Sequence, residues 1–257
     1  MDLAIIVVLT LGIGISLGMS GYGGFLIPAM LVGFMGMGAR DSVANSLWSF
    51  VLPGVLGAIL YSRKDRFRGW SLPVLLCVGT VPGTLLGRVL SVSLSETLLQ
   101  IILGSVVLAA GLSLFRRRRI HAAATPSRDA NALLTWRSLV VVGAGAFGGL
   151  AAVLTGVGGP LITVPILLVL GIEMNKVVGA ALINSVVVSL LGAASLSNIA
   201  TVNPGIVVAI TIPQLVGVPI GVWLQHRMTS VRTVPIIAAL STVTGIVLIW
   251  RTFATIG

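Results

Sequence analysis

Two glycine clusters are the residues in this chain whose types and spacing could do chemistry. Residues 21–24 read Gly-Tyr-Gly-Gly, and residues 156–159 read Gly-Val-Gly-Gly, which repeats the three glycines 135 positions later. Each cluster interrupts a long apolar run, where glycine lets the backbone leave a helix and approach a ligand closely. The backbone N–H groups that start the next helix, together with its dipole, form a site for a small anion.

A few polar side chains inside the apolar runs could complete such a site. The carboxamides of Asn184 and Gln214 are the most informative, because a carboxamide in hydrocarbon faces the bundle interior and finds a partner there. Contact between helices and lining of a substrate path are both open readings of these residues. The residues predicted to contact substrate are Gly21, Tyr22, Gly23, Gly24, Asn45, Ser46, Thr155, Gly156, Val157, Gly158, Gly159, Asn184 and Gln214.

The residues needed for a proton relay, for serine catalysis or for a cysteine-built metal site are missing from the apolar runs. No Asp or Glu lies in the interior of an apolar run, and Asp41, Glu96 and Glu173 are at segment ends, so a relay of buried carboxylates is not predicted. His121 and His226 fall in hydrophilic stretches, which leaves an intramembrane serine without a catalytic base. The single cysteine, Cys77, excludes an intramolecular disulfide and a cysteine-built metal site. We therefore expect no enzyme activity, no metal and no cofactor.

The composition indicates a protein that crosses a membrane many times. Hydrophobic residues make up 56% of the 257 residues and charged residues only 9%, and the mean hydropathy is +1.12. A water-soluble domain of this size could not cover its surface with so few charges. The net charge of +10 sits in short loops, where it orients the protein in the lipid bilayer and does not predict nucleic-acid binding.

Ten apolar segments are predicted, five on each side of a hydrophilic basic linker. We expect a first transmembrane repeat over 1–115, a cytoplasmic linker over 116–136 and a second repeat over 137–257. The segments cover residues 3–19, 24–38, 42–61, 70–90, 95–115, 136–154, 160–171, 177–197, 204–224 and 230–250. The fold class is thus an all-α polytopic membrane protein.

The two halves are internal repeats. Pairing residue i with i+135 over 14–59 gives 13 identities in 46 positions without a gap, and later glycines match at an offset of 134. Duplication of this length is typical of transporters built from two repeats. With five segments in each repeat, the second copy must enter the membrane upside down.

The basic residues independently predict the same inversion. If the linker is cytoplasmic, 13 of the 16 Lys and Arg residues lie on the cytoplasmic side. Loop 62–68 is basic, whereas its counterpart 198–203 carries no charge, as an inverted copy requires. Both termini are then expected outside the cell membrane.

Segments 24–38 and 160–171 are short for a membrane crossing. As helices they extend ~22 and ~18 Å, against ~30 Å of hydrocarbon. They could tilt across the membrane or form re-entrant hairpins that turn at the glycine clusters, and the sequence leaves both open.

These residues resemble the sulfite exporter TauE/SafE family of bacterial membrane transporters over nearly the whole chain. The resemblance rests on the duplicated Gly-x-Gly-Gly turn with a following Leu and Pro, on residues 44–47 (Ala-Asn-Ser-Leu) and 179–182 (Gly-Ala-Ala-Leu), and on Gly-Ala at 57–58 and 192–193. Where the family usually has Thr-Ser, the second copy has Ala180 and Ala181, so the resemblance implies no hydroxyl contacts there.

The resemblance implies transport of sulfite, an organosulfonate or a related sulfur oxyanion in the bacterial inner membrane. An interior-negative potential favours export of an anion by about 2.3 kcal/mol per charge per 100 mV. Alternating access of two inverted repeats is the expected mechanism. A transporter of another small anionic or neutral metabolite, and a membrane subunit without transport activity, are the alternatives.

Overall fold

The protein is a bundle of α-helices in a computed structural model that describes residues 3–20, 24–62, 70–117, 136–156, 160–172 and 174–227. Helices are the only regular elements in these ranges. They are α1 (Leu3–Ser20), α2 (Leu26–Met35), α3 (Ala39–Ser62), α4 (Ser71–Ser93), α5 (Glu96–Arg117), α6 (Trp136–Thr155), α7 (Pro160–Val169), α8 (Met174–Leu196) and α9 (Pro204–Arg227).

The first nine predicted segments each coincide with one of these helices. The tenth, 230–250, and most of the predicted linker 116–136 lie outside the described residues. Five helices are long and apolar enough to cross a membrane, namely α3, α4, α6, α8 and α9. The all-helical, multi-pass membrane architecture is therefore confirmed for the described part of the chain.

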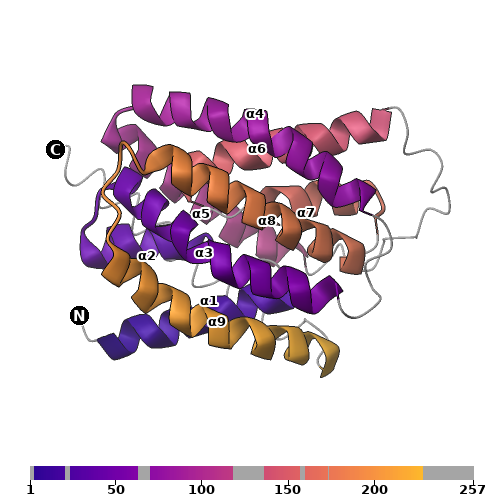
Figure 1. The fold of residues 1–257 in the computed structure, drawn as a ribbon, viewed down its shortest axis with the longest axis horizontal. Coiled ribbons are helices and arrows are strands. Elements are labelled where there is room, and N and C mark those ends of the chain that lie inside the picture. The colour runs from indigo at the N-terminus through magenta and orange to yellow at the C-terminus, as the bar shows by residue number, and fades with distance from the viewer. Residues whose placement is uncertain are drawn as a thin grey trace.

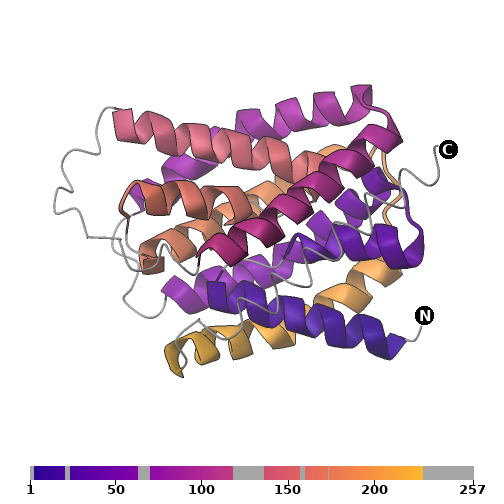
Figure 2. The same cartoon turned by 180° about the vertical axis from the view of Figure 1, so that it is seen from behind.

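The helices form three packed pairs. Figure 1 shows α4 with α6 along one edge of the bundle, α1 with α9 along the opposite edge, and α3 with α8 between them. The short helices α2 and α7 pack against α3 and α8, respectively, and α5 crosses the back of the bundle (Figure 2). Each of the three pairs α4–α6, α1–α9 and α3–α8 joins a helix from the first half of the chain to one from the second half.

Glycine allows the α4–α6 pair to pack backbone against backbone. A methyl group added to Gly83 or Gly87 would press on the carbonyl oxygen of Ala146 or Leu150, respectively. Small residues let membrane helices approach closely, so that van der Waals contact replaces the missing hydrophobic driving force. The opposite face of α4 is exposed and aliphatic, with residues such as Val78 and Leu85, as expected for contact with lipid.

The α1–α9 pair packs in the same manner. A methyl group on Gly217 would press on the carbonyl oxygen of Leu11, and one on Gly221 would press on that of Ile15. The backbones of the two outer pairs are thus in direct contact along one face of each helix.

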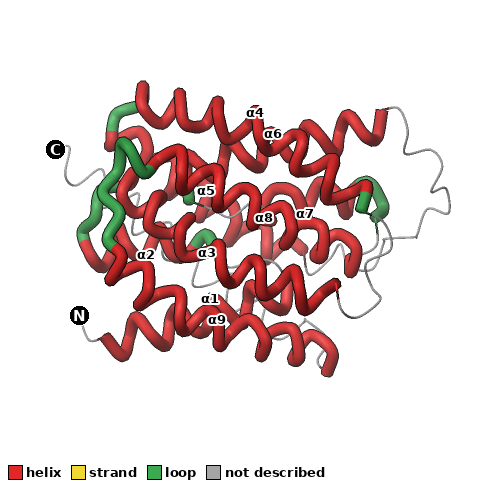
Figure 3. The backbone as a smooth tube through the Cα atoms, viewed as in Figure 1, coloured by secondary structure: helices red, strands yellow, loops and turns green. Residues whose placement is uncertain are grey.

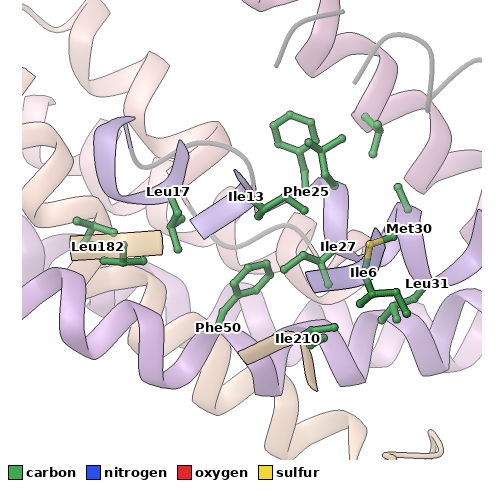
Figure 4. Packing of buried hydrophobic residues seen from close by; sticks show 14 of the residues in the cluster. Ile6, Ile13, Leu17, Phe25, Ile27, Met30, Leu31, Phe50, Leu182 and Ile210 are labelled. Atoms are coloured by element: carbon green, nitrogen blue, oxygen red, sulfur yellow. The ribbon is translucent and has the colours of Figure 1, made fainter. Parts of the chain in front are cut away.

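The central helices α3 and α8 run antiparallel. Gly57 of α3 lies against Leu182 of α8, and Gly192 of α8 lies against Leu47 of α3. Residue numbers rise along one helix as they fall along the other, so a residue i on α3 lies opposite residue 239 − i on α8. The largest buried hydrophobic cluster surrounds this pair and includes Phe25, Ile27, Phe50 and Ile210 (Figure 4).

Gly83→Ala should destabilise the protein, because the new methyl group would separate the α4 and α6 backbones. We expect a loss of about 1–3 kcal/mol, measured as a lower Tm of the purified protein in detergent.

Gly143→Ala on α6 is the matched control, because a methyl group there meets no atom within 4 Å in the described residues. That variant should be neutral or gain up to about 1 kcal/mol of helix propensity. Equal effects of the two substitutions would contradict the packing of α4 on α6.

Candidate functional site

Both predicted glycine breaks are bordered by buried residues. The first break follows α1, and the second follows α6. Gly24 and Phe25 are buried at the start of α2, and Thr155 and Gly156 are buried at the end of α6. Figure 3 shows short loop segments in the interior of the bundle, in addition to the loops at its two ends. The other residues of the predicted turns lie outside the described residues, namely Gly21, Tyr22, Gly23, Val157, Gly158 and Gly159.

Contacts with α3 give the depth of these breaks. A methyl group on Gly24 would lie 2.9 Å from the ring of Phe50, at the midpoint of the 24-residue helix α3. One on Gly156 would touch Ser46, about 6 Å along α3 from Phe50 at 1.5 Å per residue. Both breaks therefore lie deep within the bundle.

The helices that follow the breaks are too short to cross a membrane alone. Helices α2 and α7 have 10 residues each, or about 15 Å. Each ends at a glycine in the left-handed conformation, Gly36 with φ of 66° and Gly171 with φ of 76°. Met37 and Ile172 then donate backbone hydrogen bonds back to α2 and α7. Each short helix thus starts beside the buried break and closes with the same kind of glycine cap.

The N-terminus of α2 has no side-chain cap. Phe25 at the N-cap provides no side-chain hydrogen bond, and only the backbone bond from Ile27 N to Gly24 O, at 3.2 Å, closes the turn. Helix α7 begins with Pro160, whose missing N–H costs nothing at that position. Neither helix start carries a charged residue in its first turn.

Ser46 and Thr155 adjoin the second break. The Ser46 hydroxyl lies 2.8 Å from Val43 O and 3.5 Å from Gly156 O, and the Thr155 hydroxyl donates to Ala151 O at 2.6 Å. A hydroxyl has one proton, so each would have to turn away from its own helix to donate to an anion. Their predicted contact with substrate stays a prediction.

Asn45 is engaged by the loop between α8 and α9. Its Nδ2 donates to Asp41 O at 2.8 Å and to Thr201 O at 2.9 Å, and its Oδ1 accepts from Asn203 N at 2.9 Å. The Asp41 carboxylate accepts from Thr201 N at 2.8 Å. The carboxamide therefore fastens α3 to this loop, and its predicted substrate contact also stays a prediction.

Asn184 and Gln214 lie in two separate buried polar pairs. Thr80 of α4 donates to Asn184 Oδ1 at 2.8 Å, while Gln214 Nε2 lies 3.5 Å from Ser49 Oγ and 2.8 Å from Ile210 O. Both carboxamides are 0% exposed. Asn184 Nδ2 and Gln214 Oε1 have no hydrogen-bond partner among the described residues.

Ser49 and Thr80 were missing from the predicted site, although the repeat offset points to them. Residue 49 plus 135 is Asn184, and residue 80 plus 134 is Gln214, so each predicted carboxamide matches a hydroxyl in the other half. Periodicity within one helix does not reveal such a pairing. A comparison of polar residues across the two repeats would have found both.

No charged side chain neighbours these polar pairs in the described ranges. Arg88 is exposed on α4. Arg40 lies near one end of the bundle, where its Nη2 donates to Ser91 O at 2.8 Å and to Leu94 O at 3.1 Å. The deep polar groups are thus neutral amides, hydroxyls and helix starts, which can bind an anion only by hydrogen bonds and dipoles.

Comparison with known proteins identifies the family. A family profile described as "Sulfite exporter TauE/SafE" matches residues 3–248. The curated proteins and the solved structures give no match. The matched range covers all the described helices, both glycine breaks and both polar pairs, and the family transports sulfur anions across membranes. The chain is a member of the sulfite exporter TauE/SafE family.

Proposed function

We propose that this protein exports a sulfur oxyanion, such as sulfite or an organosulfonate, by alternating access of two inverted repeats. The observation that carries the proposal is the pair of buried helix breaks beside α3, where Gly24 meets Phe50 and Gly156 meets Ser46. In this arrangement residues 1–115 and 137–257 are the repeats, and 116–136 joins them in the cytoplasm.

The contacts of the central pair support inversion. Adding 135 to Gly57 and Leu47 gives Gly192 and Leu182, so the contact of Gly57 with Leu182 is matched by that of Gly192 with Leu47. A twofold axis that exchanges two antiparallel helices is perpendicular to both. Because α3 and α8 are long enough to span the membrane, this axis lies in the membrane plane, as in inverted-repeat transporters.

The outer pairs support the same axis. The contact of Gly83 with Ala146 is matched by the contact of Gly217 with Leu11. Gly217 is the repeat partner of Gly83 at an offset of 134, and Ala146 is the repeat partner of Leu11 at an offset of 135. The contact of Gly87 with α6 recurs in the same way on α1 and α9. The matched lengths and glycine caps of α2 and α7 agree with the same exchange.

The site acts by presenting helix starts to an anion at membrane depth. Each break ends in a helix N-terminus, whose partial positive charge and N–H groups favour an anion in an apolar setting. Half-helices that meet near the midplane line the substrate site of inverted-repeat transporters. The bacterial inner membrane supplies the interior-negative potential that favours export.

A transporter of another small metabolite is the second candidate function. The neutral hydrogen-bonding groups of the polar pairs favour it as much as they favour a sulfur anion. Transport of carboxylates or neutral solutes, with sulfur anions inert, would select this candidate.

Asp65→Cys and Ala200→Cys, each in a Cys77→Ala background, should react with membrane-impermeant maleimide from opposite sides. The reason is that inversion assigns the basic loop to the cytoplasm and its uncharged counterpart to the outside. Labelling of right-side-out and inverted vesicles measures this, and labelling of both from one side would refute the inversion.

Purified protein in liposomes should carry labelled sulfite or a small sulfonate down its gradient faster than protein-free liposomes do. A tenfold excess of unlabelled substrate should compete. Lack of flux for every sulfur anion tested, with protein that remains folded, would contradict the proposed function.

Gly156→Ala should lower this flux by at least tenfold. The added methyl group would crowd Ser46 and Pro28 beside the break, and φ of 65° is also strained for alanine. Gly36→Ala is the matched control, because φ of 66° imposes the same strain while the position has no described atom within 4 Å. Equal flux from the two variants would mean that the break does not shape the site.

A further inference from the structure

The two buried polar pairs carry atoms that have no hydrogen-bond partner in the described part of the chain. An unpartnered polar atom in an apolar interior costs about 1–3 kcal/mol, so each needs a physical explanation. These atoms are Asn184 Nδ2 and Gln214 Oε1, and both side chains are fully buried. Polar groups retained at such depth in a transporter are candidates for substrate contact.

The orientation of the Gln214 amide follows from its neighbours. Its Nε2 faces the carbonyl oxygen of Ile210 at 2.8 Å, and a carbonyl can only accept a hydrogen bond. The Ser49 hydroxyl donates to Ser46 O at 2.7 Å, so toward Gln214 Ser49 can only accept. The free group on Gln214 is therefore the acceptor Oε1, which repels the oxygens of a fully deprotonated anion.

The Asn184 group offers the opposite chemistry. The Thr80 hydroxyl lies 2.8 Å from Asn184 Oδ1 and 3.2 Å from Gly145 O, and its single proton is assigned to the shorter contact. With Oδ1 accepting from Thr80, the free Nδ2 group presents N–H donors suited to an anion oxygen. Asn184 lies opposite position 55 of α3, six residues beyond Ser49, or about 9 Å along the helix axis. The two groups are thus separate polar stations at different depths along α3.

Neither station has a cationic neighbour close in sequence. No Lys, Arg or His lies within several residues of Ser49, Thr80, Asn184 or Gln214 in sequence, and the guanidinium of Arg40 is engaged near one end of the bundle. The cost of moving an ion out of water rises as the square of its charge, so an uncompensated dianion is far more costly than a monoanion.

We propose that Gln214 selects the proton-bearing monoanion of a sulfur oxyanion, which for sulfite is hydrogensulfite, by accepting a hydrogen bond from the ligand's own proton. This inference rests on the proposed function and adds the ionisation state of the substrate. A ligand that presents both an acidic hydrogen and anionic oxygens satisfies Gln214 at one station and Asn184 at the other. The dianion satisfies only Asn184.

The charge carried per molecule tests the inference on the wild-type protein. In liposomes with a tenfold sulfite gradient and equal pH on both sides, the reversal potential should be about 59 mV for one charge, against about 30 mV for two. Flux should also fall about tenfold for each pH unit above the second ionisation of sulfite. Protein-free liposomes correct for leak of neutral sulfur dioxide.

Gln214→Leu tests the residue itself against methanesulfonate, a monoanion without an acidic proton. Removing the acceptor should lower the ratio of hydrogensulfite flux to methanesulfonate flux roughly tenfold, equivalent to one hydrogen bond. Thr84→Val is the control, because the Thr84 hydroxyl donates to Val81 O within its own helix. Its ratio should equal that of the wild type.

The outcomes separate this inference from the proposed function. Flux with two charges per molecule, or an unchanged ratio in folded Gln214→Leu, overturns the selection of the monoanion while transport of sulfur anions stands. Failure of every sulfur anion to move overturns both. If Gln214→Leu does not fold, the reversal potential of the wild-type protein still shows whether the monoanion or the dianion is transported.

Discussion

A helix broken inside a hydrocarbon layer exposes peptide groups that lipid cannot satisfy, and the rest of this structure follows from that constraint. Irregular backbone is tolerated at membrane depth only where protein surrounds it or where it lines a cavity. Here Gly24 and Gly156 border the breaks and are buried against α3. The long helices α3 and α8 form the scaffold that keeps both breaks away from lipid.

Close packing of the outer pairs makes this shielding possible. Glycines on α4 and α9 bring α6 and α1 into backbone contact along the two edges of the bundle. In a bilayer such contacts contribute through van der Waals packing, since lipid chains are as apolar as leucine. The aliphatic side chains of α4 that point away from α6 are left for the lipid.

Most of the fold could be predicted from the sequence, because apolar segment length and glycine position are local properties. The helices differ from the predicted segments by at most a few residues at most ends. The depth of the breaks could not be predicted, since it depends on which helices meet, and it follows from the contacts of Gly24 with Phe50 and of Gly156 with Ser46. The bonds of Asn45 to Thr201 and Asn203 escaped prediction for the same reason, because they join residues about 156 positions apart.

The two halves are not equivalent at their ends, although their centres match. Asp41 and Asn45 bind the loop after α8, whereas the corresponding positions of the second half are Lys176 and Ala180, which cannot make the same bonds. At a net 0.5–1.5 kcal/mol for each hydrogen bond, the three bonds to the loop are together worth about 1.5–4.5 kcal/mol. Reversing a two-state population takes about 5.5 kcal/mol. Opening this end of the bundle would have to break these bonds, which Lys176 and Ala180 cannot form at the corresponding positions, so the two ends are energetically unequal.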